Sequence, residues 1–229
     1  MKKCFNSNMN IVPHVNKWYP NIGILHRIFI TLRWLSTPYQ QIISFVPKHS
    51  NVLDIGCSHG LLAAVLFENN HISRYTGLDP SKKKLVIAQQ LKDLLPATHF
   101  AQCTFEDYSD QITENIITII DVFYLLPDGE VQKILNKIHL KSSKKTVLIV
   151  NTIDKNSSFG YFFDLFQEII MTHVLKLTHS KYNSFFYRTG QEFEQIFHRS
   201  GYKIVNEKQI KKLLYPYRLF VLEKRSSKS

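Results

Sequence analysis

Short apolar, β-branched runs alternate with helical stretches between residues 51 and 151. The runs predict strands over 52–55, 75–79, 98–103, 116–121 and 146–151, and the stretches between them predict helices over 61–69, 80–95 and 131–140. Parallel strands need a crossover segment, usually a helix, and such crossovers are almost always right-handed. The alternation therefore predicts βαβ units and a parallel sheet with helices on its faces.

The segments on either side of this alternation have different patterns. Apolar residues at positions 24, 25, 28, 29, 32 and 35 have helical spacing, and they predict an amphipathic helix over 24–35. After the fifth expected strand, residues 159–177 form an aromatic-rich helical stretch. A further helix is expected over 191–200, followed by two late strands over 202–205 and 217–223.

Composition limits the class of protein. A chain of 229 residues is long enough for one domain with a sizeable core and too short for two ordinary ones. Its net charge of +11 favours anionic partners, although a generally cationic surface explains the charge equally well. Three scattered cysteines predict no disulfide framework and no metal site, and together with the lack of an apolar leader after Met1 they favour a cytoplasmic location.

The segment 52–60, with the sequence VLDIGCSHG, joins an expected strand to an expected helix, where a nucleotide-binding turn belongs. A dinucleotide fingerprint needs glycine at two places that Ser58 and Leu61 occupy here. Gly56 and Gly60, with Asp54 two residues ahead, suit S-adenosylmethionine instead, because small residues let the backbone approach the adenosine and Asp54 can support the cationic amino end. Asp79 ends the next strand and can accept both ribose hydroxyls.

Three segments, 54–60, 75–79 and 119–122, resemble in order the first, second and fourth motifs of the class I S-adenosylmethionine-dependent methyltransferase superfamily. The resemblance covers roughly residues 37–223. It implies an α/β fold: a single doubly wound, Rossmann-like, seven-stranded sheet that is mostly parallel, with one antiparallel strand supplied by the late strand pair. An ordinary turn in an unrelated α/β protein is the alternative, and the three segments together argue against it.

The resemblance also implies a set of cofactor-binding residues. They are Asp54, Gly56, Cys57, Ser58, Gly60, Asp79, Pro80, Thr104, Phe105, Asp121 and Val122. Thr104 and Phe105 would flank the adenine, and Asp121 and Val122 would lie near the methionine end. Two departures are visible: Thr104 stands where an acid often reads the adenine, and Ser58 replaces the usual middle glycine, which it can do if its φ is negative.

Methyl transfer from a sulfonium is an in-line displacement that positioning and electrostatics can largely accomplish. Two side chains at the carboxyl edge of the sheet are candidates for a catalytic role: Tyr124 after the fourth strand and Asp154 after the fifth. The alternatives are a buried tyrosine with a packing role and an acid that caps the following helix.

The expected organisation is an N-terminal helical cap over 1–36, a methyltransferase domain over 37–223 with a helical insertion or lid over 155–190, and a disordered tail over 224–229. Caps and insertions of this kind set substrate specificity in the superfamily. We expect helix 24–35 and segment 159–177 to close an apolar acceptor pocket, with Arg27 and Arg33 available for a carboxylate. The predicted reaction is O-methylation of a small apolar or lipid-like acceptor, and mere packing of the two segments is the alternative.

Two other functions stay open. An RNA methyltransferase is suggested by the charge of +11, but the basic residues are thinly spread and no RNA-binding module is present, so nucleic acid is the less favoured partner. A non-catalytic cofactor-binding module is the third hypothesis, and the complete set of Asp54, Gly56, Gly60 and Asp79 argues against it. Peripheral membrane contact through helix 24–35 is a further expectation.

Overall fold

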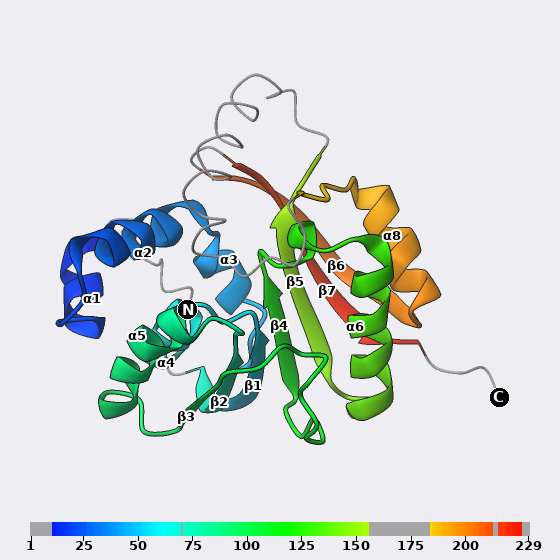
Figure 1. The fold of residues 1–229 in the computed structure, drawn as a ribbon. Coiled ribbons are helices and arrows are strands. Elements are labelled where there is room, and N and C mark those ends of the chain that lie inside the picture. The colour runs from blue at the N-terminus through cyan, green and yellow to red at the C-terminus, as the bar shows by residue number, and fades with distance from the viewer. Residues whose placement is uncertain (1–10, 70, 156–183, 213–214, 226–229) are drawn as a thin grey trace, which may run out of the picture.

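A computed structural model describes residues 11–69, 71–155, 184–212 and 215–225 (Figure 1). Seven strands form one sheet in the order β3-β2-β1-β4-β5-β7-β6. Their bounds are β1 Ser50–Ile55, β2 Ile72–Leu78, β3 Thr98–Ala101, β4 Ile116–Ile120, β5 Val147–Ile153, β6 Tyr202–Lys212 and β7 Tyr215–Lys224. The first five strands pair in parallel, and β7 is antiparallel to both β5 and β6. The predicted doubly wound sheet with one antiparallel strand is therefore confirmed.

Helices cover both faces of the sheet. Their bounds are α1 Ile11–Trp18, α2 Ile24–Ser36, α3 Tyr39–Ile43, α4 Leu61–Glu68, α5 Lys82–Ala88, α6 Asp128–Lys141 and α8 Gly190–Arg199. Alternate residues of a strand point to opposite faces, so Ile116 and Ile120 pack in the core under α4 and α5, whereas Ile117 and Ile119 pack under α6 and α8. The two layers of helices lie on either side of the sheet in Figure 1.

Several element bounds differ from those expected. The predicted helix 80–95 is α-helical only over α5 and continues as a 3₁₀ helix, η1 Gln89–Asp93, before Pro96. Strands β6 and β7 are longer than the expected strands 202–205 and 217–223. They pair with each other as far as Lys212 and Tyr215, beyond the residues of β7 that pair with β5. Lys224, expected to begin the tail, is the last residue of β7. The predicted helical stretch 159–177 lies outside the described residues.

Helix α2 forms where predicted, and most of its apolar stripe faces outward. Four stripe residues, Ile24, Leu25, Ile28 and Leu32, are more than half exposed, and the buried residue of the helix is Ile30. Phe29 and Arg33 also point toward the sheet and line a pocket there. The inward face of α2 therefore carries both apolar and charged side chains, because Arg33 reaches the buried carboxylate of Asp121 beneath the helix.

Candidate active site

The turn between β1 and α4 has left-handed backbone at three positions: Gly56 with φ 82°, Ser58 with φ 53° and Gly60 with φ 75°. Two amides at its start, those of Gly56 and Cys57, donate to the Leu78 carbonyl at 2.8 and 2.9 Å, which fixes the turn against β2. This curled backbone brings successive peptide groups to the carboxyl edge of the sheet, at the N-terminal end of α4.

The expectation that Ser58 has a negative φ is wrong. A left-handed serine costs roughly 1–2 kcal/mol relative to glycine, because its Cβ approaches the following carbonyl. Two contacts hold it there: its amide donates to Asp79 Oδ2 at 3.0 Å, and its hydroxyl lies 3.0 Å from Nδ1 of His59. Polar contacts of the side chain and amide thus support the left-handed conformation of Ser58.

Gly56 is required by its surroundings as well as by its φ. A Cβ built on it would lie 2.4 Å from Cγ2 of Val122, a distance that real Cβ atoms do not show. Val122 follows β4, so the turn after β1 and the end of β4 are in direct contact. The predicted cofactor residues Gly56 and Val122 are therefore brought together.

Replacing Gly56 by alanine should lower the free energy of unfolding by about 1–3 kcal/mol, because the new methyl group must displace Val122 while the backbone keeps a strained φ. Gly129→Ala in α6 is the matched control: no atom lies within 4 Å of its added Cβ. That control should raise stability slightly, by about 0.4–1 kcal/mol. Urea unfolding of both variants measures the difference, and equal midpoints would contradict the steric argument.

Asp79, one residue beyond β2, has a buried and fixed carboxylate. Oδ2 accepts the amide of Ser58 at 3.0 Å, and Oδ1 accepts the amide of Ser81 at 2.8 Å. Each carboxylate oxygen has a second lone pair, so both can accept a further hydrogen bond. The carboxylate is thus oriented at the sheet edge as the ribose prediction requires.

Asp54 lies in β1 below the turn and is almost fully buried. The hydroxyls of Tyr75 and Thr118 both donate to its carboxylate, the latter at 2.7 Å. Burial raises the pKa of Asp54 to about 6, although the two hydrogen bonds act to lower it and the nearby charge of Asp79 acts to raise it. A buried carboxylate with a raised pKa is one that would gain from a cationic ligand.

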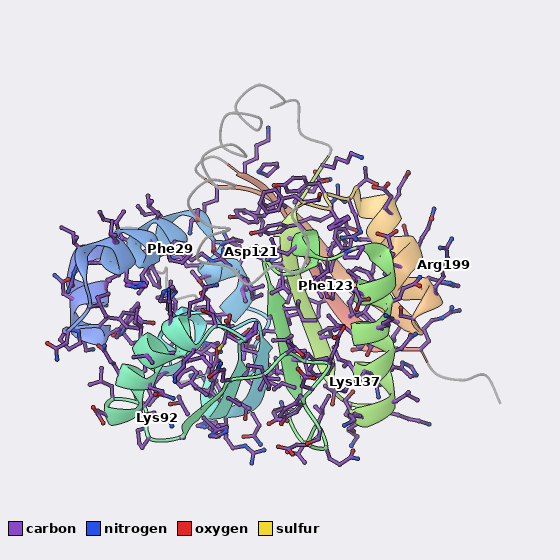
Figure 2. The ribbon with its side chains drawn as sticks, viewed as in Figure 1. Phe29, Lys92, Asp121, Phe123, Lys137 and Arg199 are labelled. Carbon is purple, nitrogen blue, oxygen red and sulfur yellow. The ribbon has the colours of Figure 1, made fainter. Side chains whose placement is uncertain are left out.

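Asp121 follows β4 with φ 56° and forms the other anionic group at this edge. Arg33 Nη2 lies 3.1 Å from its Oδ2, and the side chains of Thr37 and Asn151 donate to its carboxylate at 3.2 and 2.7 Å. Burial raises the pKa of Asp121, and the Arg33 charge opposes that rise. Helix α2 is therefore joined to the sheet through an ion pair at the site, and Figure 2 shows Asp121 between α2 and the strands.

Aromatic side chains surround the Arg33 guanidinium. Tyr39, Tyr124 and Tyr217 all interact electrostatically with it. Tyr124 is half-buried, and its ring centroid lies 5.8 Å from those of both Phe185 and Tyr187. Burial raises the pKa of Tyr124 to about 12, so its phenol is protonated at neutral pH and donates hydrogen bonds rather than accepting protons.

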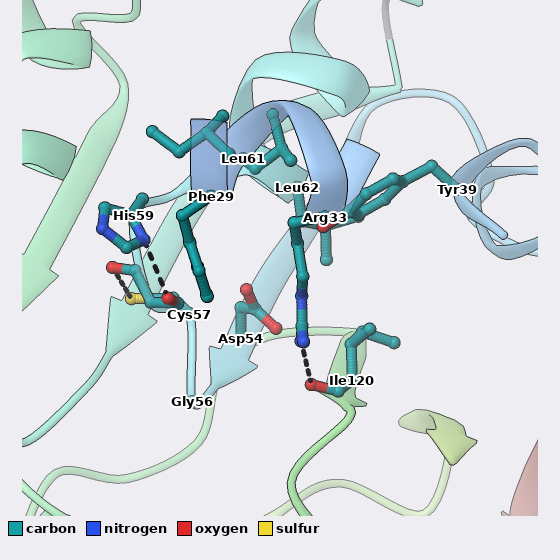
Figure 3. A pocket seen from close by; sticks show the side chains of 12 residues that line it. Phe29, Arg33, Tyr39, Asp54, Gly56, Cys57, His59, Leu61, Leu62 and Ile120 are labelled. Atoms are coloured by element: carbon teal, nitrogen blue, oxygen red, sulfur yellow. Dashed lines mark hydrogen bonds between the residues drawn. The ribbon is translucent and has the colours of Figure 1, made fainter. Parts of the chain in front are cut away.

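A small pocket with a cavity volume of about 20 Å³, open on one side, lies between α2 and the turn (Figure 3). Its walls come from α2, α3, β1, the turn, α4 and β4, and the lining residues are Phe29, Ile30, Arg33, Tyr39, Asp54, Gly56, Cys57, Ser58, His59, Leu61, Leu62 and Ile120. Arg33 enters it between Asp54 and Ile120, whose carbonyl it reaches at 3.5 Å. In this conformation the cavity has room for about one water molecule.

Helix α2 also contacts the turn through histidines. Nδ1 of His26 lies 3.2 Å from Nε2 of His59, and Tyr19 donates its hydroxyl to the His59 carbonyl at 2.8 Å. Burial lowers the pKa of His59 to about 3, and Lys84 acts in the same direction. A neutral His59 thus braces the turn against the N-terminal helices, as its place within the turn leads one to expect.

Of the predicted cofactor residues, Asp54, Gly56, Cys57 and Ser58 line this pocket, whereas Gly60, Asp79, Asp121 and Val122 are not among its lining residues. Phe105 is buried on the opposite face of the sheet, with the Lys137 ammonium 5.2 Å from its ring centroid. Thr104 donates to Asp107 at 2.7 Å, and Pro80 is exposed. Cys57 lines the pocket, and burial raises the pKa of its thiol well above the usual range. The adenine end of the prediction is therefore the part that the geometry supports least.

Asp154, predicted as a catalytic candidate, is held by an arginine. Nε and Nη2 of Arg218 donate to its Oδ2 at 2.9 and 2.6 Å, and Arg218 also pairs with Glu207. This buried ion pair joins β5, β6 and β7, and it explains the residue without a catalytic role.

The site residues that were not predicted from sequence are those that hydrogen-bond to the buried carboxylates. They are Tyr75 and Thr118 at Asp54, and Thr37 and Asn151 at Asp121. Asn151 could have been predicted, because it ends the expected fifth strand just as Asp121 ends the fourth. These two strands are parallel neighbours, and Asn151 pairs with Ile120, the residue before Asp121.

The described residues lack two kinds of feature. They contain no cluster of three or more His, Cys, Asp or Glu side chains placed to hold a metal ion. Within the same part of the chain, no helix combines the length and the apolar character that a membrane span requires.

Comparison with known proteins gives a family match. The family model of the methyltransferase domain matches residues 32–207, which include the last residues of α2, the turn and strands β1 to β5. No curated protein sequence matches the chain.

Solved structures of methyltransferases share the fold. Magnesium protoporphyrin IX methyltransferase from Synechocystis PCC 6803, with bound SAH, has a TM-score of 0.62 at 16% identity, covering 93% of each chain. The M1A22 tRNA methyltransferase of B. subtilis has a TM-score of 0.58 at 15% identity, covering 83% of this chain and 66% of that one. An O-methyltransferase from neocarzinostatin biosynthesis, in complex with S-adenosylmethionine and 2-hydroxy-5-methyl naphthoic acid, has a TM-score of 0.65 at 13% identity, covering 87% and 56%.

Proposed function

The chain belongs to the methyltransferase-domain family, within the class I S-adenosylmethionine-dependent superfamily, and we propose that it methylates a small, apolar carboxylic acid at oxygen. The observation that carries the acceptor proposal is the Arg33 guanidinium, which lines the pocket at the carboxyl edge with tyrosines around it. A planar guanidinium recognises carboxylates through paired hydrogen bonds, and aromatic walls suit an apolar body.

The residues of the turn fit the cofactor. S-adenosylmethionine is an adenosine joined to a zwitterionic amino acid, and it supplies an activated methyl group when bound. Asp79 would hold the ribose hydroxyls, Gly56, Ser58 and Gly60 would let the adenosine approach the backbone, and Asp54 would face the cationic amino group. The raised pKa of Asp54 supports this assignment, because a buried carboxylate of this kind gains from a nearby cation.

Neither catalytic candidate is placed as a general base, which favours an acceptor that needs none. Tyr124 is protonated at neutral pH, and Asp154 is held by Arg218. A carboxylic acid is already ionised at neutral pH, so its oxygen can attack the methyl group directly. In this proposal Arg33 orients the carboxylate, Tyr124 donates a hydrogen bond to it, and Asp121 holds Arg33 in position.

An RNA acceptor is the second candidate. It is favoured by the net charge of +11 and by the similarity to a tRNA methyltransferase. The partly enclosed pocket under α2 argues for the smaller acceptor, because a base must be extruded from its strand to enter a site of this kind.

Tyr124→Phe should lower kcat/KM for acid acceptors by roughly 10–100-fold, because a hydrogen bond to a charged group is lost, and it should leave cofactor affinity unchanged. The measurement is methyl transfer to a series of aromatic and medium-chain carboxylic acids, with cofactor binding followed by calorimetry. Tyr202→Phe is the matched control, since the Tyr202 hydroxyl is buried on the far face against the Leu135 carbonyl. Equal kcat/KM in Tyr124→Phe and wild type would leave Tyr124 with a packing role only.

A further inference from the structure

The outer face of α2 is an exposed aliphatic surface. Ile24 and Leu25 are 73% and 78% exposed, and Ile28 and Leu32 are 51% and 55% exposed. At helical spacing these four side chains form one continuous stripe on the side of α2 that points away from the pocket. Large aliphatic side chains gathered on one surface mark an interaction site rather than a normal scatter of exposed residues.

The charge of this region identifies the partner. The first 53 residues contain no aspartate or glutamate. Three cations, Lys17, Arg27 and Arg33, lie on α1 and α2, whereas Lys48 precedes β1 at the other edge of the sheet and Lys2 and Lys3 lie outside the described residues. Arg33 pairs with Asp121 and Lys17 with Glu68, which leaves Arg27 as a cation without an acidic partner on this helix pair. Exposed Lys82 and Lys83 add to this positive charge at the start of α5, which begins at the same edge of the sheet as α2 (Figure 1).

We propose that the stripe of Ile24, Leu25, Ile28 and Leu32 docks α2 onto an anionic lipid surface. Aliphatic side chains on one face of a helix with cations beside it are the features of helices that lie in the membrane interface. Each lysine or arginine near an anionic leaflet adds about 1 kcal/mol of attraction.

A second copy of this chain fits the stripe less well, since two acid-free cationic segments would face each other. RNA also fits less well, since the stripe offers no aromatic ring for base stacking.

Docking in this orientation deepens the proposed function. Phe29, Ile30 and Arg33 on the opposite face of α2 line the pocket, so the helix would lie between the lipid and the acceptor site. Docking would thus hold the acceptor pocket close to a bilayer, in which an apolar acid dissolves. The vesicle experiment below measures no methyl transfer, so its outcome is independent of whether the acceptor proposal is correct.

The test is flotation of the full chain with phosphatidylcholine vesicles, with and without phosphatidylserine. The wild type should float with the serine-containing vesicles, and much less with phosphatidylcholine alone or at high salt. The double variant Leu25→Ser, Ile28→Ser should bind at least about tenfold more weakly, because two apolar side chains no longer enter the interface. Leu140→Ser is the matched control, since Leu140 is 84% exposed on α6 and should be replaceable without effect.

Several results would overturn the proposal. These are a wild type that stays with the aqueous phase, a double variant that floats as well as the wild type, or an equal loss in Leu140→Ser. Light scattering that shows a wild-type dimer dissociated by the double variant would assign the stripe to a second copy instead. Unchanged thermal unfolding and cofactor affinity in the double variant show that it is folded, because its substituted residues face away from the pocket.

Discussion

Replacing Asp79 by alanine should weaken the binding of both S-adenosylmethionine and its demethylated product by roughly 1–3 kcal/mol, or about 5–150-fold. The carboxylate is buried, fixed by the amides of Ser58 and Ser81, and has lone pairs left for two ribose hydroxyls. Isothermal titration calorimetry measures both affinities. Unchanged affinity would remove the ribose assignment.

Because Asp79 also supports the turn, the ribose contact has to be separated from the structural one. A product analogue that lacks one ribose hydroxyl provides the separation. The wild type should bind the analogue more weakly than the product, whereas Asp79→Ala should bind the two almost equally, since the hydroxyl has lost its partner. Asp93→Ala is a matched control at the end of η1, with no contact to the turn. Equal discrimination by the wild type and Asp79→Ala would show that Asp79 acts through the turn alone.

Cofactor affinity should fall as the pH is lowered through about 6. Asp54 takes up a proton in this range, and a neutral carboxyl no longer attracts the cationic amino group of S-adenosylmethionine. The expected slope approaches tenfold per pH unit below the pKa. Calorimetry between about pH 5 and pH 8 measures it, and Asp54→Asn should give a weaker affinity with a flatter profile. A wild-type profile that is flat across this range would contradict the assignment of Asp54.

The raised pKa of Asp54 also predicts that its ionised carboxylate lowers the free energy of unfolding of the unliganded protein at neutral pH. A folded-state pKa of about 6, above the ordinary value of 3.8, means that the native state binds the proton more tightly than the unfolded state does. The stabilising effect of protonated Asp54 is therefore complete below pH 4 and is lost as the pH rises to about 6. Asp54→Asn should consequently stabilise the unliganded protein at pH 7, by an amount on the order of 1–3 kcal/mol, while weakening cofactor binding.

The sheet and the turn could be predicted from sequence because their signals are local. Strand and helix patterns alternate over short distances, and Gly56 and Gly60 mark the turn directly. The φ of Ser58 could not be predicted, since two contacts that form only in the folded chain hold the serine in the left-handed region. The pair of Asp154 and Arg218 was equally hidden, because it joins residues 64 positions apart through the antiparallel pairing of β5 and β7.

Helix α2 shows the limit of periodicity most clearly. The spacing of its apolar residues shows correctly that they share a face, but spacing does not say whether that face is turned inward. The inward face is set by Arg33, which must reach Asp121, and by Ile30 in the core. The rotation of the helix thus agrees with these two long-range contacts and leaves four aliphatic side chains exposed.

The most direct test of the proposed function is the transfer of a labelled methyl group from S-adenosylmethionine to separate pools of lipids, small carboxylic acids and RNA. The proposal predicts label in the lipid or small-acid pool, released by mild alkali as expected for a methyl ester, and a much smaller yield with Tyr124→Phe. Label confined to the RNA pool, or alkali-stable label in the small-molecule pools, would contradict it.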